Sequence, residues 1–116
     1  MTCCSTNDVL LHRTGESKLY YYDLGEAIKG RTITAVTSIS ADDALLTISN
    51  ESIISVETSD YDQFGNALTI EANTGIKWNM ANGTAGVEDD SYTATLTFTF
   101  TTSAGTEQAV LRVKVL

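Results

Sequence analysis

Apolar and polar residues alternate with a period of two along residues 91–115, which is the most regular pattern in the sequence. In the first half, alternate positions are apolar or aromatic, namely Tyr92, Ala94, Leu96, Phe98 and Phe100. The positions between them are all threonine, namely Thr93, Thr95, Thr97, Thr99 and Thr101. Because successive side chains of a strand point to opposite faces, this pattern predicts a strand with one face in a core. A turn containing Gly105 follows, and residues 109–115 return with Leu111, Val113 and Val115 inward, so the segment is predicted to be an antiparallel hairpin.

Shorter runs upstream predict further strands. They cover residues 32–40, 45–49, 53–58, 67–72 and 76–80. Polar segments separate these runs, namely residues 50–52, a loop at 59–66, a turn at 73–75 and a long loop at 81–91. Together with the hairpin they give about seven closely spaced strands and no convincing amphipathic helix. We therefore predict an all-β fold, an immunoglobulin-like antiparallel β-sandwich of about seven strands with an extended N-terminal arm.

Two aromatic residues agree with a sandwich. Tyr92 follows the long loop, at the place where sandwiches put a tyrosine whose hydroxyl bonds to the preceding backbone. Trp78 lies one strand earlier and is predicted to fill the core. The antibody-type disulfide is missing, because neither the second nor the sixth predicted strand carries a cysteine. The predicted sandwich is therefore held by packing alone.

Residues 1–22 are predicted to be an N-terminal arm, and residues 23–116 the sandwich domain. The arm contains the segments VLLH and LYYYD, which are more apolar than a disordered linker. We predict that it orders on docking to a partner, and that the partner-binding residues are Leu10, Leu11, Tyr20, Tyr21 and Tyr22. Three consecutive tyrosines place rings on both faces of any strand, so one side can pack on the domain and the other on a partner. The alternative is that Tyr20–Tyr22 form the first edge strand of the sandwich.

Length and charge restrict the class of protein. A chain of 116 residues has the size of one domain, and its net charge is −8. Residues 1–31 hold four acidic and four basic residues, so the other 85 residues carry eleven acids against three bases. Such a surface repels phosphate, which argues against nucleic acid and anionic membranes as partners. No apolar run reaches the length of a signal peptide or a membrane span, so we expect the chain to be kept in a reducing cytoplasm.

Residues able to carry chemistry are few and scattered. Cys3 and Cys4 are adjacent, and neighbouring cysteines do not form an unstrained disulfide, so both are predicted to be reduced thiols. His12 is the only histidine, and no metal-binding spacing surrounds it. No nucleophile has a base placed to activate it, and no phosphate-binding glycine loop is present. We predict no catalytic residues, no cofactor and no metal site, and hence not an enzyme.

Acidic pairs recur in the predicted loops. They are Asp42 with Asp43, Asp60 with Asp62, and the run 88–90. Carboxylates of this kind can bind Ca²⁺, but none has the spacing of a calcium loop. The preferred interpretation is that they are solvated turn residues that also discourage pairing of exposed edges.

The C-terminal third resembles the hairpin of small immunoglobulin-like proteins encoded in tailed-phage structural gene clusters. The matching residues are Gly83, Thr84, Ala85, Gly86, Tyr92, Thr102, Ser103, Ala104 and Gly105, and the segment GRTITAVTSIS is similar to the first strand of that family. Two departures are the longer gap at 87–91 and Asn82 in place of the first loop glycine. The resemblance implies a virion structural protein that decorates or cements the capsid, made in the host cytoplasm and located on the capsid surface. It further implies the major capsid protein as partner and a homo-oligomer, most often a trimer, with head fibre, neck and tail decoration as related roles.

Two surfaces have alternative interpretations. The sandwich loops are predicted, in the alternative, to bind carbohydrate or a host-surface ligand through Tyr61, Phe64 and Trp78. The threonine face of the strand at 91–102 is predicted to face solvent, and the alternative is a flat contact with a symmetry mate.

Overall fold

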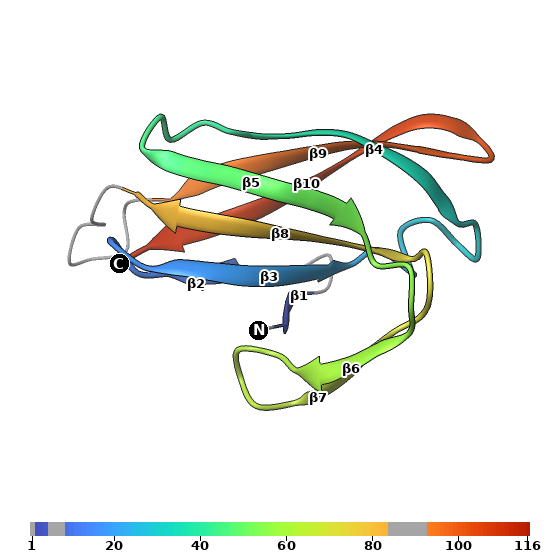
Figure 1. The fold of residues 1–116 in the computed structure, drawn as a ribbon, viewed down its shortest axis with the longest axis horizontal. Coiled ribbons are helices and arrows are strands. Elements are labelled where there is room, and N and C mark those ends of the chain that lie inside the picture. The colour runs from blue at the N-terminus through green and yellow to red at the C-terminus, as the bar shows by residue number, and fades with distance from the viewer. Residues whose placement is uncertain (1, 5–8, 84–92) are drawn as a thin grey trace.

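The computed structural model describes residues 2–4, 9–83 and 93–116, and for residues 2–4 the backbone alone. Over these residues the chain is all-β (Figure 1). The described strands are β1 (Thr2–Cys4), β2 (Val9–His12), β3 (Ser17–Asp23), β4 (Ile33–Ala41), β5 (Leu46–Ile53), β6 (Thr58–Tyr61), β7 (Ala67–Ile70), β8 (Gly75–Asn82), β9 (Ala94–Thr102) and β10 (Gly105–Val115). The prediction of an all-β fold is confirmed.

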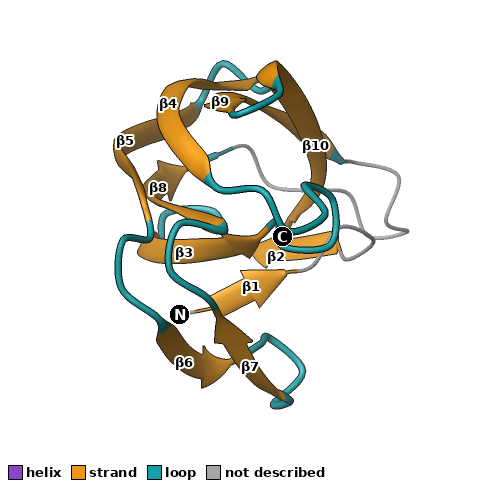
Figure 2. Cartoon of the chain, turned by 90° about the vertical axis from the view of Figure 1, so that its right-hand side faces the viewer, coloured by secondary structure: helices purple, strands orange, loops and turns teal. Residues whose placement is uncertain are grey.

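Two four-stranded sheets form the two layers of a β-sandwich (Figure 2). The first sheet, sheet A, has the strand order β1-β3-β8-β5, and the second, sheet B, has the order β2-β10-β9-β4. The pairs β1–β3 and β2–β10 are parallel, and the other pairs within the two sheets are antiparallel. Strands β6 and β7 form a separate hairpin that projects beside β1, β2 and β3 (Figures 1 and 2).

The core lies between the two sheets and is rich in aromatic rings. Along β9 the apolar residues are buried and the intervening threonines are half-buried, so the period of two read from the sequence is confirmed there. Trp78 of β8 is fully buried, with ring centroids 5.0 Å from Phe98 and 5.9 Å from Tyr20. Each large side chain buried in this way stabilises the fold by roughly 1.5–3 kcal/mol. The predicted role of Trp78 as a core residue is therefore confirmed.

The predicted arm is part of the sandwich. Residues 9–12 form β2, which lies parallel to β10, and residues 17–23 form β3, which pairs with β8. Leu10 and His12 of β2 are buried, and so are Tyr20 and Tyr22 of β3, because they alternate with a period of two and face the core. The segment 9–22 is therefore part of the domain and not an extension from it. Of the two interpretations of Tyr20–Tyr22, the structure agrees with the one in which these residues form a strand of the sandwich. This strand lies one position inside the sheet edge, since β1 pairs with its other side.

Two segments differ from the predicted strands. Residues 45–49 and 53–58 were expected to form separate strands, but Leu46–Ile53 is one strand with a bulge between Ser49 and Ser52. Asn50 has φ 54°, a left-handed conformation that asparagine tolerates, so the chain absorbs extra residues without leaving the sheet. Residues 59–66 were expected to be a loop, but Ser59–Tyr61 pair with Ala67–Thr69 in the β6–β7 hairpin. The merging of two predicted strands into β5 and the additional strand β6 leave the number of strands unchanged, and β1, β2 and β3 raise it from about seven to ten described strands.

Two predictions concern residues 84–92, which lie outside the described residues. One is the bond from the Tyr92 hydroxyl to the preceding backbone, and the other is the solvated turn at the acidic run 88–90. The described strand begins at Ala94. Neither prediction is tested by the structure.

Candidate partner-binding surface

The β6–β7 hairpin ends in a turn that its own sequence builds. Oδ1 of Asp62 accepts hydrogen bonds from the backbone N–H of Phe64 and of Asn66, each at 2.9 Å. Gly65 has φ 83°, which only glycine adopts without strain. An aspartate that caps its own turn, followed by a glycine in the left-handed region, is a common way to close a hairpin. The turn fixes the direction of the side chains between residues 61 and 66.

The hairpin tip is tied to the edge of sheet B by one side chain. The amide oxygen of Gln63 accepts a hydrogen bond from the backbone N–H of Leu11 at 2.9 Å, and its amide nitrogen donates to the carbonyl oxygen of Val9. Both partners belong to β2, the edge strand of sheet B. A side chain 52 positions away in the sequence therefore occupies the open side of that strand.

Large apolar side chains are exposed around this contact. Tyr61 is 64% exposed, Phe64 is 63% exposed, and Leu11 of β2 is 42% exposed. Because Gln63 lies between the two aromatic residues in the sequence and binds the backbone of Leu11, the three residues lie in one region, here called the tip surface. Exposed aromatic and aliphatic groups are enriched at protein interfaces, so this region is the strongest candidate for a binding surface among the described residues.

The structure divides the predicted partner-binding residues into two groups. Leu10, Tyr20 and Tyr22 are each 1% exposed, so the prediction that they contact a partner is wrong for the folded chain. Leu11 is exposed beside the hairpin, and Tyr21 is half-buried on the outer face of sheet A. Each buried residue belongs to the core face of its strand, and its neighbours in sequence point outward.

The predicted ligand-binding residues are divided in the same way. Tyr61 and Phe64 are exposed on the hairpin, as expected, whereas Trp78 is 0% exposed between the sheets. Trp78 cannot form a recognition platform with them, and that part of the prediction is wrong. The reason is its position on the inward face of the central strand β8, where it packs edge-on against Phe98.

His12 links the two sheets inside the core. Its Nδ1 lies 2.8 Å from the hydroxyl of Tyr20, and its Nε2 lies 2.8 Å from the carbonyl oxygen of Asn82. A carbonyl only accepts, so Nε2 carries a proton and donates it, and in the neutral imidazole the Tyr20 hydroxyl then donates to Nδ1. Burial, with a smaller effect from the charge of Glu16, raises the pKa of Tyr20 to about 12. With both ring nitrogens occupied, His12 has no free lone pair for a metal ion.

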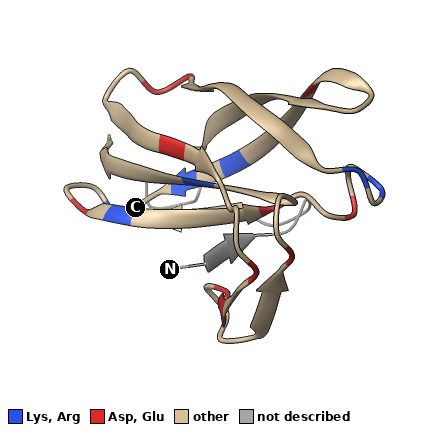
Figure 3. Cartoon of the chain, turned by 45° about the vertical axis from the view of Figure 1, so that its right-hand side comes forward, with Lys and Arg blue, Asp and Glu red and all other residues tan. Residues whose placement is uncertain are grey.

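The charged residues are unevenly distributed over the surface. Between residues 32 and 76 the chain carries seven acidic residues and no basic residue. Several of these acidic residues lie on the β6–β7 hairpin and on the segments that connect it to the sheets (Figure 3). Two basic residues, Arg112 and Lys114, lie on β10 directly opposite Val9 and Leu11 of β2. The tip surface is thus placed between an acidic hairpin and a basic strand.

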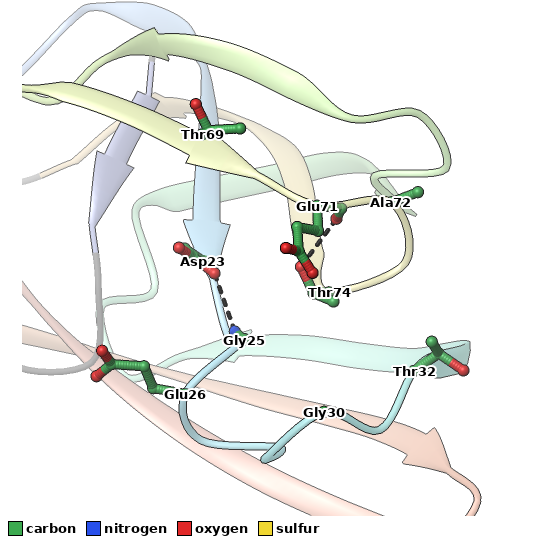
Figure 4. Close-up of a pocket in the computed structure, with 9 residues that line it drawn as sticks. All are labelled: Asp23, Gly25, Glu26, Gly30, Thr32, Thr69, Glu71, Ala72 and Thr74. Atoms are coloured by element: carbon green, nitrogen blue, oxygen red, sulfur yellow. Dashed lines mark hydrogen bonds between the residues drawn. The ribbon is translucent and has the colours of Figure 1, made fainter.

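One cavity of about 420 Å³ opens between the loop after β3 and the β7–β8 turn (Figure 4). Three carboxylates line it, but Asp23 accepts a hydrogen bond from Gly25 N–H at 2.9 Å, so one of them already holds the local turn. The hydroxyl of Thr74 donates to the backbone oxygen of Glu71 at 2.8 Å. The described residues contain no group of three side chains able to hold a metal ion.

The carboxylates of Asp42 and Asp43 also bind backbone N–H groups. Oδ1 of Asp43 accepts the N–H of Leu45 at 3.0 Å, and Oδ1 of Asp42 accepts the N–H of Thr95 at 2.7 Å. The bond of Asp43 is the local type that makes aspartate common in turns, whereas the bond of Asp42 joins residues 53 positions apart and ties the end of β4 to β9. Among the described residues no helix is long and apolar enough to cross a membrane.

Comparison of the sequence with protein-family models and with curated proteins finds no match. The residues quoted above for the phage immunoglobulin-like proteins therefore remain the basis of that resemblance.

Proposed function

We propose that this chain is a non-enzymatic virion structural protein of the tailed-phage immunoglobulin-like type that decorates the capsid and stabilises it. Its partner is the major capsid protein. The strand order supports the immunoglobulin-like part of the proposal. Strands β3-β8-β5 take the places of B, E and D in an immunoglobulin constant-type sandwich, and β10-β9-β4 take those of G, F and C. Strand β1 has the position of A but runs parallel to β3, whereas A and B are antiparallel in that sandwich.

The tip surface is the observation that carries a binding function. Of the eight large hydrophobic residues exposed among the described residues, Leu11, Tyr61 and Phe64 gather where the hairpin meets β2. A decoration protein acts by burying surface between itself and the shell, and exposed aromatic residues are the side chains that contribute most at such contacts. We therefore assign the contact with the shell to the tip surface and not to Tyr20 and Tyr22, which are buried.

Co-sedimentation with shells assembled from the major capsid protein of the phage that encodes this chain tests the proposal. Wild-type protein is expected to pellet with the shells, and Tyr61→Ser and Phe64→Ser are each expected to weaken binding by about tenfold or more. Leu45→Ser is the matched control, because Leu45 is 58% exposed in the turn before β5 and lies outside the tip surface. Wild-type protein that stays in the supernatant contradicts the capsid role, and equal binding of all variants contradicts the assigned surface.

A second candidate function uses the same two aromatic rings. Tyr61 and Phe64 are almost equally exposed at the end of a projecting hairpin, an arrangement that also suits stacking against a sugar ring or a host-surface ligand. Binding of the wild-type chain to a glycan array, lost in Tyr61→Ser and kept in Leu45→Ser, would favour this function over capsid decoration.

A further inference from the structure

Among the described strands, β2 has a neighbour in its sheet, β10, on one side, and its other side is here called the open side. It lies at the edge of sheet B, and the parallel ladder to β10 continues as Leu116 N–H donates to the carbonyl oxygen of His12 at 2.9 Å. In a parallel ladder alternate residues bond to the same neighbour, so the backbone groups of Val9 and Leu11 point to the open side. Unpaired backbone groups in a row are a template for another strand.

Gln63 occupies this template as a peptide group would. A primary amide carries the same acceptor and donor as a peptide bond, and here the acceptor binds Leu11 N–H and the donor binds Val9 C=O. A parallel neighbour would form the same two bonds through one residue opposite Leu10, and an antiparallel neighbour would form them through two residues. The side chain therefore closes the edge without a strand being present.

We propose that the open side of β2 is the docking site for a second copy of this chain, and that Gln63 holds the site in the single chain. Two β2 strands pair antiparallel about a two-fold axis at Leu10. Val9 of one copy then lies opposite Leu11 of the other, and each such pair exchanges both backbone hydrogen bonds. Sheet B of one copy continues into sheet B of the other. The inference goes beyond capsid decoration and does not rest on it.

The side chains of β2 suit this pairing. Leu10 points into its own core at 1% exposure, while Val9 and Leu11 point outward. In the pair, each Val9 would meet the opposite Leu11, so a leucine that is 42% exposed in the single chain becomes covered. The same strand segment is therefore complementary to itself in both backbone and side chains, which is the requirement for a two-fold contact.

The hydrogen bonds alone do not drive the exchange. Two single chains make four bonds through their Gln63 side chains, and the pair makes four between backbones, so the count is unchanged. Pairing requires that both hairpin tips move away, and the net charge of −8 on each copy opposes association. Wild-type protein is therefore expected to pair only weakly, and more tightly at higher salt. The resemblance implies a trimer, whereas this edge is suited to a dimer.

Sedimentation equilibrium of the full chain and three variants tests the inference. Gln63→Ala leaves Val9 and Leu11 without partners and is expected to tighten dimer formation by about tenfold or more relative to wild type. Gln108→Ala is the matched control, because Gln108 is a glutamine on β10 whose amide donates to the Thr99 hydroxyl at 3.3 Å. It is expected to match wild type.

The double variant Gln63→Ala with Leu11→Pro is expected to be monomeric. Proline at position 11 removes an N–H that points away from β10, so the ladder inside the sandwich is kept while strand addition is blocked. Circular dichroism and thermal melting establish that each variant is folded. If Gln63→Ala has the same mass distribution as wild type, the inference is wrong. It is also wrong if the double variant still forms a dimer or a trimer. If the double variant does not fold, hydrogen exchange at Leu11 in Gln63→Ala replaces it: the amide must become protected as the protein concentration rises.

Discussion

The hydroxyl of Tyr20 lies 2.8 Å from Nδ1 of His12, and this buried bond joins a strand of sheet A to a strand of sheet B. On its other side the imidazole donates to the carbonyl oxygen of Asn82, at the end of β8. Strands β2, β3 and β8 thus meet at one ring. Polar groups buried in this way stabilise a fold only while each has its partner.

Tyr20→Phe is expected to destabilise the protein by about 1–3 kcal/mol, because the substitution keeps the ring and leaves Nδ1 of His12 without a donor. Urea unfolding followed by tryptophan fluorescence measures the change. Tyr21→Phe is the control, since Tyr21 is half-buried on the outer face of sheet A, and its effect is expected to stay within about 0.5 kcal/mol. Equal effects of the two variants would contradict the role of the buried bond.

A chain that starts at Asp23 is expected not to fold. The deletion removes β2 and nearly all of β3, and with them Leu10, Tyr20 and Tyr22 from the core. It also exposes the side of β8 that pairs with β3, whereas the sequence pattern predicted a domain complete from residue 23. Thermal melting followed by near-ultraviolet circular dichroism measures the result. A chain that starts at Val9 keeps β2 and β3 and is expected to melt cooperatively, and a cooperative transition in the shorter chain would show that the arm is dispensable.

Local alternation allowed much of the fold to be predicted. The hairpin of β9 and β10 and the burial of Trp78 follow from residue types and a period of two, both of which are visible within a short window. The N-terminal strands were harder, because β2 joins the sheet by parallel pairing with a strand about a hundred positions away. The letters VLLH show that this strand is largely apolar, but they do not show which element it packs against.

The tip surface could be predicted only in part. Tyr61 and Phe64 stand out as aromatic residues in a polar segment, and the structure leaves both exposed. Gln63 could not be found in the same way, because its function depends on two backbone groups of β2 that no sequence pattern connects to it. Tyr20 and Tyr22 were assigned to a partner because residue type alone does not distinguish an aromatic residue in a core from one at an interface.

Gly75→Ala is expected to destabilise the protein by about 1–3 kcal/mol. A Cβ at this position would lie 2.8 Å from the carbonyl oxygen of Tyr22, and 2.7 and 2.8 Å from side-chain carbons of Ile70 and Ile54. The backbone of β3 cannot yield as a flexible side chain would, and both isoleucines are buried at the base of the hairpin. Gly25→Ala is the control, because its nearest contact is the Asp23 carboxylate at 3.2 Å, and chemical denaturation should show only a small change for it. Equal stability of the two variants would contradict the close approach at Gly75.

Glu107 is expected to make stability depend on pH in the acid range. Its carboxylate accepts a hydrogen bond from the Thr102 hydroxyl and one from Arg31 at 2.7 Å. These two groups, the hydroxyl first and the guanidinium second, lower the pKa of Glu107 in the folded chain. A carboxyl whose pKa is lower in the folded than in the unfolded state stabilises the fold above the unfolded value, about 4.3, and the contribution is lost as the pH falls through the folded pKa.

Glu107→Gln isolates this contribution. The variant is expected to be less stable than wild type at pH 7, and the difference is expected to shrink as the pH is lowered below about 4. Thermal melts of both proteins between neutral and acid pH measure it. Glu51→Gln, at an exposed position of β5, removes the same charge from the chain without touching Arg31, so it controls for the change in net charge. A difference between wild type and Glu107→Gln that persists unchanged at acid pH would mean that the carboxylate acts through packing and not through its charge.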